Sequence, residues 1–95
     1  MPSESLYLSA AIERVASNID KFSTLMAFNG SITDMELKVM LNAYPTLYII
    51  AERSLQVGNL RRAEKYYVLL KRIETEITKR YAACVSDLEQ KLMSE

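Results

Sequence analysis

The sequence predicts an all-α protein whose helices pack antiparallel around a single core. Apolar residues recur at intervals of three and four along the whole chain, which is the spacing of one helix face. No run alternates with the period of two that a strand requires, and the two glycines and two prolines fall where helices should begin or end. At 95 residues, the length suits one domain. We therefore expect one helical domain over residues 1–95, built as a four-helix antiparallel array.

The first helix is expected over residues 4–28. Ser3 or Ser5 could cap its free N–H groups, and Asn29–Gly30 should end it, because both residues tolerate left-handed backbone. Its apolar residues follow alternating steps of four and three, so they share one face. They are Leu8, Ile12, Val15, Ile19, Phe22 and Met26.

The second helix is expected from Thr33 to Ala43, which completes an N-terminal part over residues 1–43. Thr33 and Glu36 have the spacing of a capping box, and Asp34 places a negative charge at the positive end of the helix dipole. Tyr44–Pro45 should end this helix, because the residue before a proline avoids helical geometry.

The third helix should run from Pro45 to Gly58, and Asn59 should cap a fourth helix that reaches Leu92. At ~1.5 Å per residue the fourth helix would span roughly 50 Å, more than the shorter helices can cover. Its continuation over residues 81–95 should therefore pack on the first helix or pair with another molecule. Its apolar stripe is Ala63, Tyr66, Tyr67, Leu70, Ile73, Ile77, Tyr81, Cys84, Leu88 and Leu92.

The expected hairpin over residues 44–80 has small residues at its crossing, a glycine at its turn, and then an aromatic and an apolar residue. These are Ala51, Gly58, Ala63, Tyr67 and Leu70. The pattern resembles one tetratricopeptide repeat. It departs from that family at Leu47, where tryptophan is common, at Ser54, where tyrosine is common, and after Ile77, where no proline follows. A generic helical hairpin would favour the same small residues and glycine.

The resemblance implies a protein-binding function. In length and helical content the chain is similar to the small type III secretion chaperones that hold a needle subunit in the cytoplasm. By that likeness we expect a cytoplasmic adaptor or chaperone that holds an amphipathic helix of a small helical partner. The concave face of the hairpin and the end of the last helix would make the contact. The candidate partner-binding residues are Leu47, Tyr48, Ala51, Tyr66, Tyr67, Leu70, Ile77 and Tyr81.

Tyr66 and Tyr67 are adjacent on a helix, so their side chains point about 100° apart and cannot both face one core direction. Tyrosine combines a large apolar ring with a hydroxyl that needs a partner, which makes it common at interfaces. We expect Tyr67 to pack within the hairpin, and Tyr66 and Tyr48 to be the candidates for partner contact.

The composition argues against several classes of function. The chain has no histidine and one cysteine, Cys84, so the commonest general base, the usual zinc ligands and an intramolecular disulfide are absent. No phosphate loop or serine elbow is present. We expect no enzyme activity, no cofactor and no metal. The N-terminus does not resemble a signal peptide, and no apolar run reaches ~20 residues, so we expect no membrane partner.

Two further interpretations use the charged and heptad faces. Lysine plus arginine and aspartate plus glutamate number twelve each, so no nucleic-acid partner is expected. Five basic residues nevertheless gather on the last helix: Arg61, Arg62, Lys65, Lys71 and Arg72. They could form a solvated face, or a contact for an acidic partner or a phosphate backbone.

Residues Ile19–Asp20, Asn29 and 33–37 resemble the Hha family, which binds the nucleoid protein H-NS. A homodimer through the first and last helices, or a heterodimer, is a further alternative.

Overall fold

The computed structural model of the chain contains three helices, namely α1 (Pro2–Phe28), α2 (Met35–Gln56) and α3 (Leu60–Met93). It describes residues 2–28 and 32–94, and leaves out the side chains of residues 2–4, 28, 84, 87, 88 and 91. Within these described residues there is no strand, so the all-helical fold class is confirmed. The prediction of four helices was wrong, because the second and third expected helices are one.

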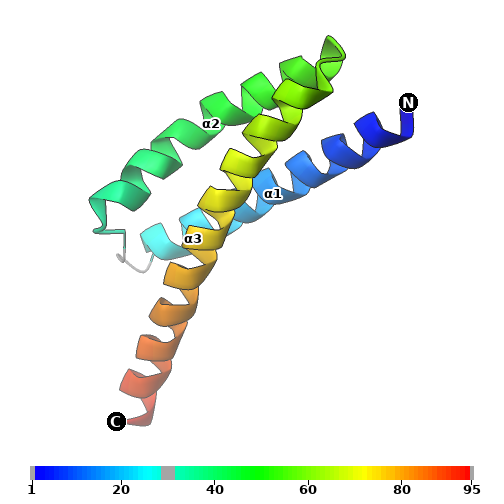
Figure 1. Cartoon of the computed structure of the whole chain (residues 1–95). Helices are drawn as coiled ribbons and strands as arrows, with labels where there is room; N and C mark the ends of the chain where they lie inside the picture. Colours follow the sequence, from blue (N-terminus) through cyan, green and yellow to red (C-terminus); the bar gives the residue numbers. More distant parts are fainter. Residues whose placement is uncertain (1, 29–31, 95) are drawn as a thin grey trace.

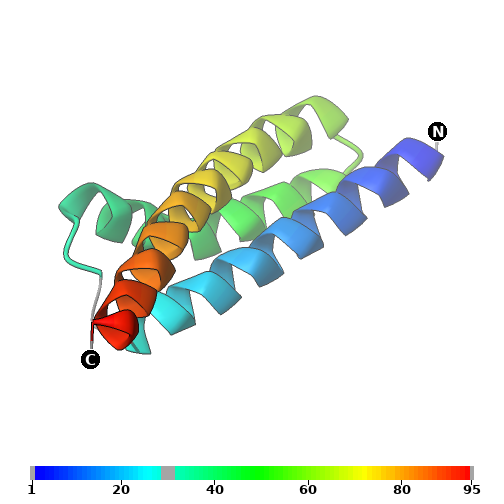
Figure 2. The same cartoon turned by 90° about the horizontal axis from the view of Figure 1, so that it is seen from below.

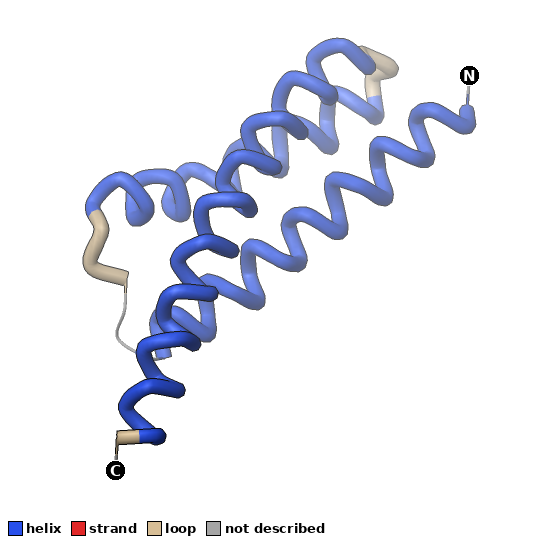
Figure 3. Tube along the Cα trace, turned by 60° about the horizontal axis from the view of Figure 1, so that its bottom comes forward, coloured by secondary structure: helices blue, strands red, loops and turns tan. Residues whose placement is uncertain are grey.

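Helices α2 and α3 form an antiparallel hairpin, and α1 lies along it (Figures 1 and 2). Helix α1 runs opposite to α2 and packs more extensively on α3 than on α2. The molecule is elongated, with extents of 57 × 25 × 16 Å. The last turns of α3 continue beyond the ends of α1 and α2 (Figures 1 and 3). The surplus length expected for the last helix is thus present in the fold.

Pro45 lies inside α2 and does not end a helix there. A proline lacks the backbone N–H and crowds the preceding turn, which is why local sequence predicts a break. Packing on both sides of the proline opposes that preference, since Leu41 and Leu47 both contact the same core. The Tyr44 hydroxyl also donates to Asp20 Oδ1 of α1 at 2.7 Å. These contacts hold both halves of α2 against the other helices.

The start of α2 is capped by Asp34, one residue later than predicted. The Asp34 carboxylate accepts from the Leu37 N–H at 3.2 Å, and its other oxygen pairs with Arg80 of α3 at 2.9 Å. The predicted Thr33–Glu36 capping box was therefore wrong, although Asp34 does place its charge at the helix N-terminus. One aspartate caps α2 and also ties it to α3.

The start of α1 also differs from the prediction. Helix α1 begins at Pro2, ahead of Ser3 and Ser5, so neither serine occupies its cap position. Proline suits the first helical position, where its missing N–H would have no partner. The predicted end at Asn29–Gly30 lies outside the described residues.

The turn between α2 and α3 forms as predicted. Gly58 has a φ of 79°, which a side chain would disfavour. Its N–H donates to the Leu55 carbonyl at 3.1 Å, and the Asn59 N–H donates to the Ser54 carbonyl at 2.8 Å, which is the Schellman pattern. The Asn59 side chain then accepts from the Arg62 N–H at 3.2 Å. Asn59 therefore both closes α2 and caps α3.

The core lies where the heptad face of α1 meets the inner face of the hairpin. The predicted α1 face is confirmed, with four of its residues buried and Leu8 and Phe22 partly buried against them. The hairpin contributes Ala51 and Ala63, whose small side chains allow close approach of the backbones, together with larger apolar residues. The fully buried larger side chains are Ile12, Val15, Ile19, Met26, Leu70 and Ile77.

One buried carboxylate links α1 to α3. Glu74 is 9% exposed; its Oε2 accepts from Asn18 Nδ2 at 3.2 Å, and its Oε1 accepts from Lys71 Nζ at 2.6 Å. Burying a charge is costly unless it is paired and hydrogen-bonded, and both conditions are met here. This polar contact helps to fix the register between the two helices.

Candidate protein-binding surfaces

Three of the eight predicted partner-binding residues lie in the core. Ala51, Leu70 and Ile77 are each 0% exposed. They pack with the heptad face of α1, which occupies the inner face of the hairpin that the prediction assigned to a partner. A partner cannot contact these three side chains while the three helices remain packed together.

The other five predicted residues reach the surface in part. Each packs one side against the core and leaves the rest of the ring or side chain accessible: Leu47, Tyr48, Tyr66, Tyr67 and Tyr81. The Tyr81 ring meets the Phe22 ring of α1 with centroids 5.0 Å apart. The five do not form one continuous site, because Tyr66 and Tyr67 open on different sides of α3.

The divergence of Tyr66 and Tyr67 agrees with their adjacent positions on a helix. Tyr67 lines a groove between α1 and α3, together with Tyr7 and Leu8 of α1. Tyr66 lies on the other side, beneath the guanidinium of Arg62, whose carbon is 5.8 Å from the ring centre. This distance suits a cation–π contact. Tyr66 therefore belongs to a basic surface, and Tyr67 to the packing between helices.

Two tyrosines of α2 act as hydrogen-bond donors. Burial raises the pKa of Tyr44 to about 12, and its hydrogen bond to Asp20 contributes further. The hydrogen bond to Glu52 raises the pKa of Tyr48 to about 12, with burial as the second cause. Both phenol groups stay protonated at neutral pH, so they donate to carboxylates without adding negative charge.

These raised pKa values predict a loss of stability in alkaline solution. A folded-state pKa of about 12 against an ordinary value of 10.0 means that the folded protein holds the phenol proton more tightly. The contribution is therefore complete below about pH 10 and is lost as the pH rises toward 12. We expect the urea midpoint of Tyr44→Phe to fall less steeply over this range than that of the wild type. Tyr7→Phe, at an exposed ring, is the matched control, and its urea midpoint should fall as steeply as that of the wild type. If the midpoint of Tyr44→Phe also falls as steeply as that of the wild type, folding does not raise the pKa of Tyr44.

The end of α3 presents apolar side chains that α1 and α2 do not cover. Arg80 pairs with Asp34 and Tyr81 contacts Phe22, and from there α3 continues past the other helices (Figures 1 and 3). On this distal segment (residues 82–93), Leu92 is 67% exposed and Met93 is 87% exposed. The predicted stripe residues Cys84 and Leu88 have side chains outside the described residues.

The outer face of α2 is a surface that sequence reasoning missed. No charged residue occurs between Lys38 and Glu52, and Val39 and Ile49 are largely exposed on this stretch. Exposed apolar residues grouped without charge are typical of contact surfaces. The signal was the uncharged run itself, which we divided between two separate helices.

The structure provides no metal centre or membrane span within the part of the chain that it describes. No group of three or more cysteine, aspartate or glutamate side chains there is placed to hold a metal ion. None of the described helices combines the length and the apolar character needed to cross a bilayer.

Comparisons of the chain with family models, with curated proteins and with solved structures gave no significant match. The likenesses to the tetratricopeptide and Hha families therefore depend only on the residues quoted above, and remain predictions.

Proposed function

We propose that this protein is an adaptor or chaperone that binds an amphipathic helix of a partner protein, with the distal segment of α3 as the contact. The observation that supports this proposal most is the uncovered apolar surface of that segment, where Leu92 and Met93 are exposed. The apolar stripe of α3 begins in the core and continues past it to Leu92, which is exposed.

The physical chemistry of a short helix favours such a partner. The distal segment continues a helix that is already formed in the core, so it needs no new nucleus, but most helical stability in proteins comes from tertiary packing of an apolar face. Val85 and Leu92 are seven residues apart and so share a face, the spacing that packs against a second helix. Burying a leucine or methionine side chain contributes about 1.5–3 kcal/mol. A partner helix would supply this burial and stabilise the segment at the same time.

The more specific form of the proposal is a small cytoplasmic chaperone for a needle subunit of a type III secretion system. It is supported by the wholly helical character of the described residues and by the α2–α3 hairpin. The alternative, an Hha-like modulator of a nucleoid protein, would use charged faces, and its binding should weaken steeply with salt. The homodimer alternative, expected through the first and last helices, cannot use the heptad face of α1, because that face is buried within its own chain.

The proposal is tested by capture of partners from a lysate of the host with tagged wild-type protein and matched variants. Leu92→Asp/Met93→Asp should reduce the amount of the captured helical protein at least about tenfold. The control, Leu6→Asp/Tyr7→Asp, changes two exposed apolar neighbours of α1 near the other end of the molecule and should capture as much as the wild type. Equal capture by both variants would contradict the proposal, and sedimentation of the purified protein shows whether the partner is a second copy.

A further inference from the structure

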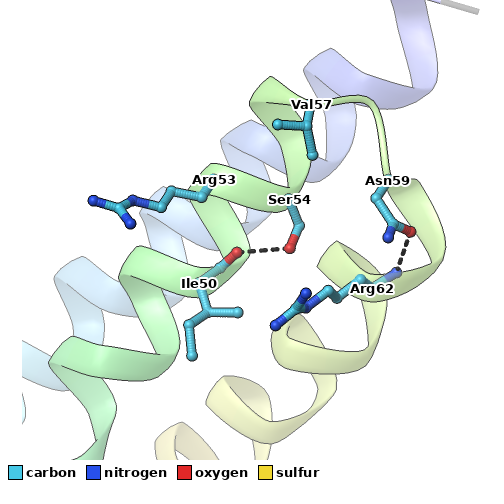
Figure 4. Close-up of a pocket in the computed structure, with 6 residues that line it drawn as sticks. All are labelled: Ile50, Arg53, Ser54, Val57, Asn59 and Arg62. Atoms are coloured by element: carbon cyan, nitrogen blue, oxygen red, sulfur yellow. Dashed lines mark hydrogen bonds between the residues drawn. The ribbon is translucent and has the colours of Figure 1, made fainter.

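A small hollow lies between α2 and α3 beside their turn (Figure 4). Ile50 of α2 and Val57, the C-cap residue that follows α2, form its apolar surface, and the surface that lines it is almost entirely apolar. The Ser54 hydroxyl does not change this, because it donates to the Ile50 carbonyl at 2.7 Å. The Asn59 side-chain oxygen is likewise occupied by the cap of α3. The hollow therefore offers a seat for an apolar group.

Basic side chains surround this apolar seat. Arg53 extends outward from α2, and Arg62 approaches from the first turns of α3 (Figure 4). A neighbouring hollow shares Asn59 and Arg62 and adds Arg61, Lys65 and Tyr66. All four cations are exposed. We call the hollow and these four cations, Arg53, Arg61, Arg62 and Lys65, the basic hollow.

Within the described residues, no ion pair joins a cation of the basic hollow to a carboxylate. Among the residues that the structure describes, the ion pairs are Lys71–Glu74 and Arg80–Asp34, and neither involves Arg53, Arg61, Arg62 or Lys65. The guanidinium of Arg62 instead lies over the Tyr66 ring. Positive charge next to uncovered apolar surface is complementary to a ligand that brings both negative charge and an apolar group.

We propose that the basic hollow binds an acidic amphipathic segment of a partner protein. A leucine- or phenylalanine-sized side chain of that segment would lie on Ile50 and Val57. Aspartate or glutamate residues flanking it would pair with Arg53 and Arg62, whose planar guanidinium groups suit bidentate contact with carboxylates. The apolar seat favours a peptide over a phosphate backbone, which has no side chain to fill it. This site is distinct from the distal segment of α3 and does not depend on it.

The proposal is tested by selecting binders of the full chain from a displayed library of random helical peptides. The expected result is enrichment of peptides with one large apolar residue flanked by aspartate or glutamate. The binding of the enriched peptide should weaken at least about tenfold in Arg53→Gln/Arg62→Gln. It should remain unchanged in Arg72→Gln/Lys79→Gln, which removes the same charge from exposed positions elsewhere on α3. The methyl NMR signals of Ile50 and Val57 should shift on binding.

Three results would overturn the proposal. They are a selection that enriches no acidic peptides, equal loss of affinity in both double variants, and unshifted Ile50 and Val57 signals. A fluorescein-labelled DNA duplex is titrated in parallel at physiological ionic strength. If the duplex binds more tightly than the peptides and loses affinity only in Arg53→Gln/Arg62→Gln, the surface recognises nucleic acid instead. Circular dichroism of each variant confirms that the helices are retained.

Discussion

Ile77→Ala is expected to lower the free energy of unfolding by about 2–5 kcal/mol, because the substitution removes buried methyl groups and leaves a cavity. Ile77 is 0% exposed and belongs to the core in which α3 meets the other helices. A domain of this size has a total stability of about 5–15 kcal/mol, so the loss is a large fraction of it. The melting temperature should fall by at least about 10 °C.

Val68→Ala provides the matched control for this prediction. It also shortens an apolar side chain of α3, but Val68 is 59% exposed, and surface substitutions usually change stability by less than about 0.5 kcal/mol. Urea unfolding followed by circular dichroism measures both variants. Similar losses for Ile77→Ala and Val68→Ala would show that the core does not lie between α3 and α1 as described.

Pro45→Ala is expected to raise the free energy of unfolding by about 1–3 kcal/mol. Proline in a helix interior costs about 3 kcal/mol relative to alanine, and Pro45 lies inside α2 with its ring exposed. Alanine restores the N–H that can donate to the Leu41 carbonyl and removes the clash of the ring with the preceding turn. Part of the gain is offset, because proline also restricts the unfolded chain.

Thr46→Ala separates this effect from ordinary helix propensity. Thr46 is the exposed neighbour of Pro45, and its replacement should stabilise α2 by no more than about 0.7 kcal/mol. Thermal and urea unfolding of both variants give the comparison. If Pro45→Ala destabilises the protein, then the chain breaks at Pro45 in solution and α2 is two helices, as the sequence alone predicts.

Local signals were sufficient to predict part of the fold. The heptad spacing of α1 identified its buried face, and Gly58 with Asn59 marked the turn between α2 and α3, because each depends on residues close in sequence. Pro45 misled the prediction for a physical reason. Its local cost is opposed by contacts of Leu41 and Tyr44 with other helices, and such long-range contacts are not visible in the sequence.

The candidate site was harder to predict, since an apolar residue on a helix face is typical of a core and of an interface alike. Ala51, Leu70 and Ile77 were assigned to a partner but contact α1 within the same chain. The surplus length of α3 was visible, because it requires only a count of residues. The basic hollow was not visible, because Arg62 lies on α3, whereas its apolar neighbours Ile50 and Val57 lie on α2 and at the C-cap of α2.

The two proposed surfaces lie toward opposite ends of an elongated molecule, the basic hollow beside the α2–α3 turn and the distal segment at the end of α3 (Figure 1). One partner long enough to reach both would contact the chain along its length. Two separate partners could instead be joined through it. Either arrangement is compatible with the proposed adaptor function.

Hydrogen–deuterium exchange of the backbone amides in residues 82–93, with and without the captured partner, tests the central claim most directly. Without a partner these amides should exchange much faster than those around Leu70, because a short helix outside the core opens often. With the partner bound they should become protected, while the amides around Leu70 change little. Unchanged exchange in residues 82–93 on binding would contradict the claim that the distal segment of α3 is the contact.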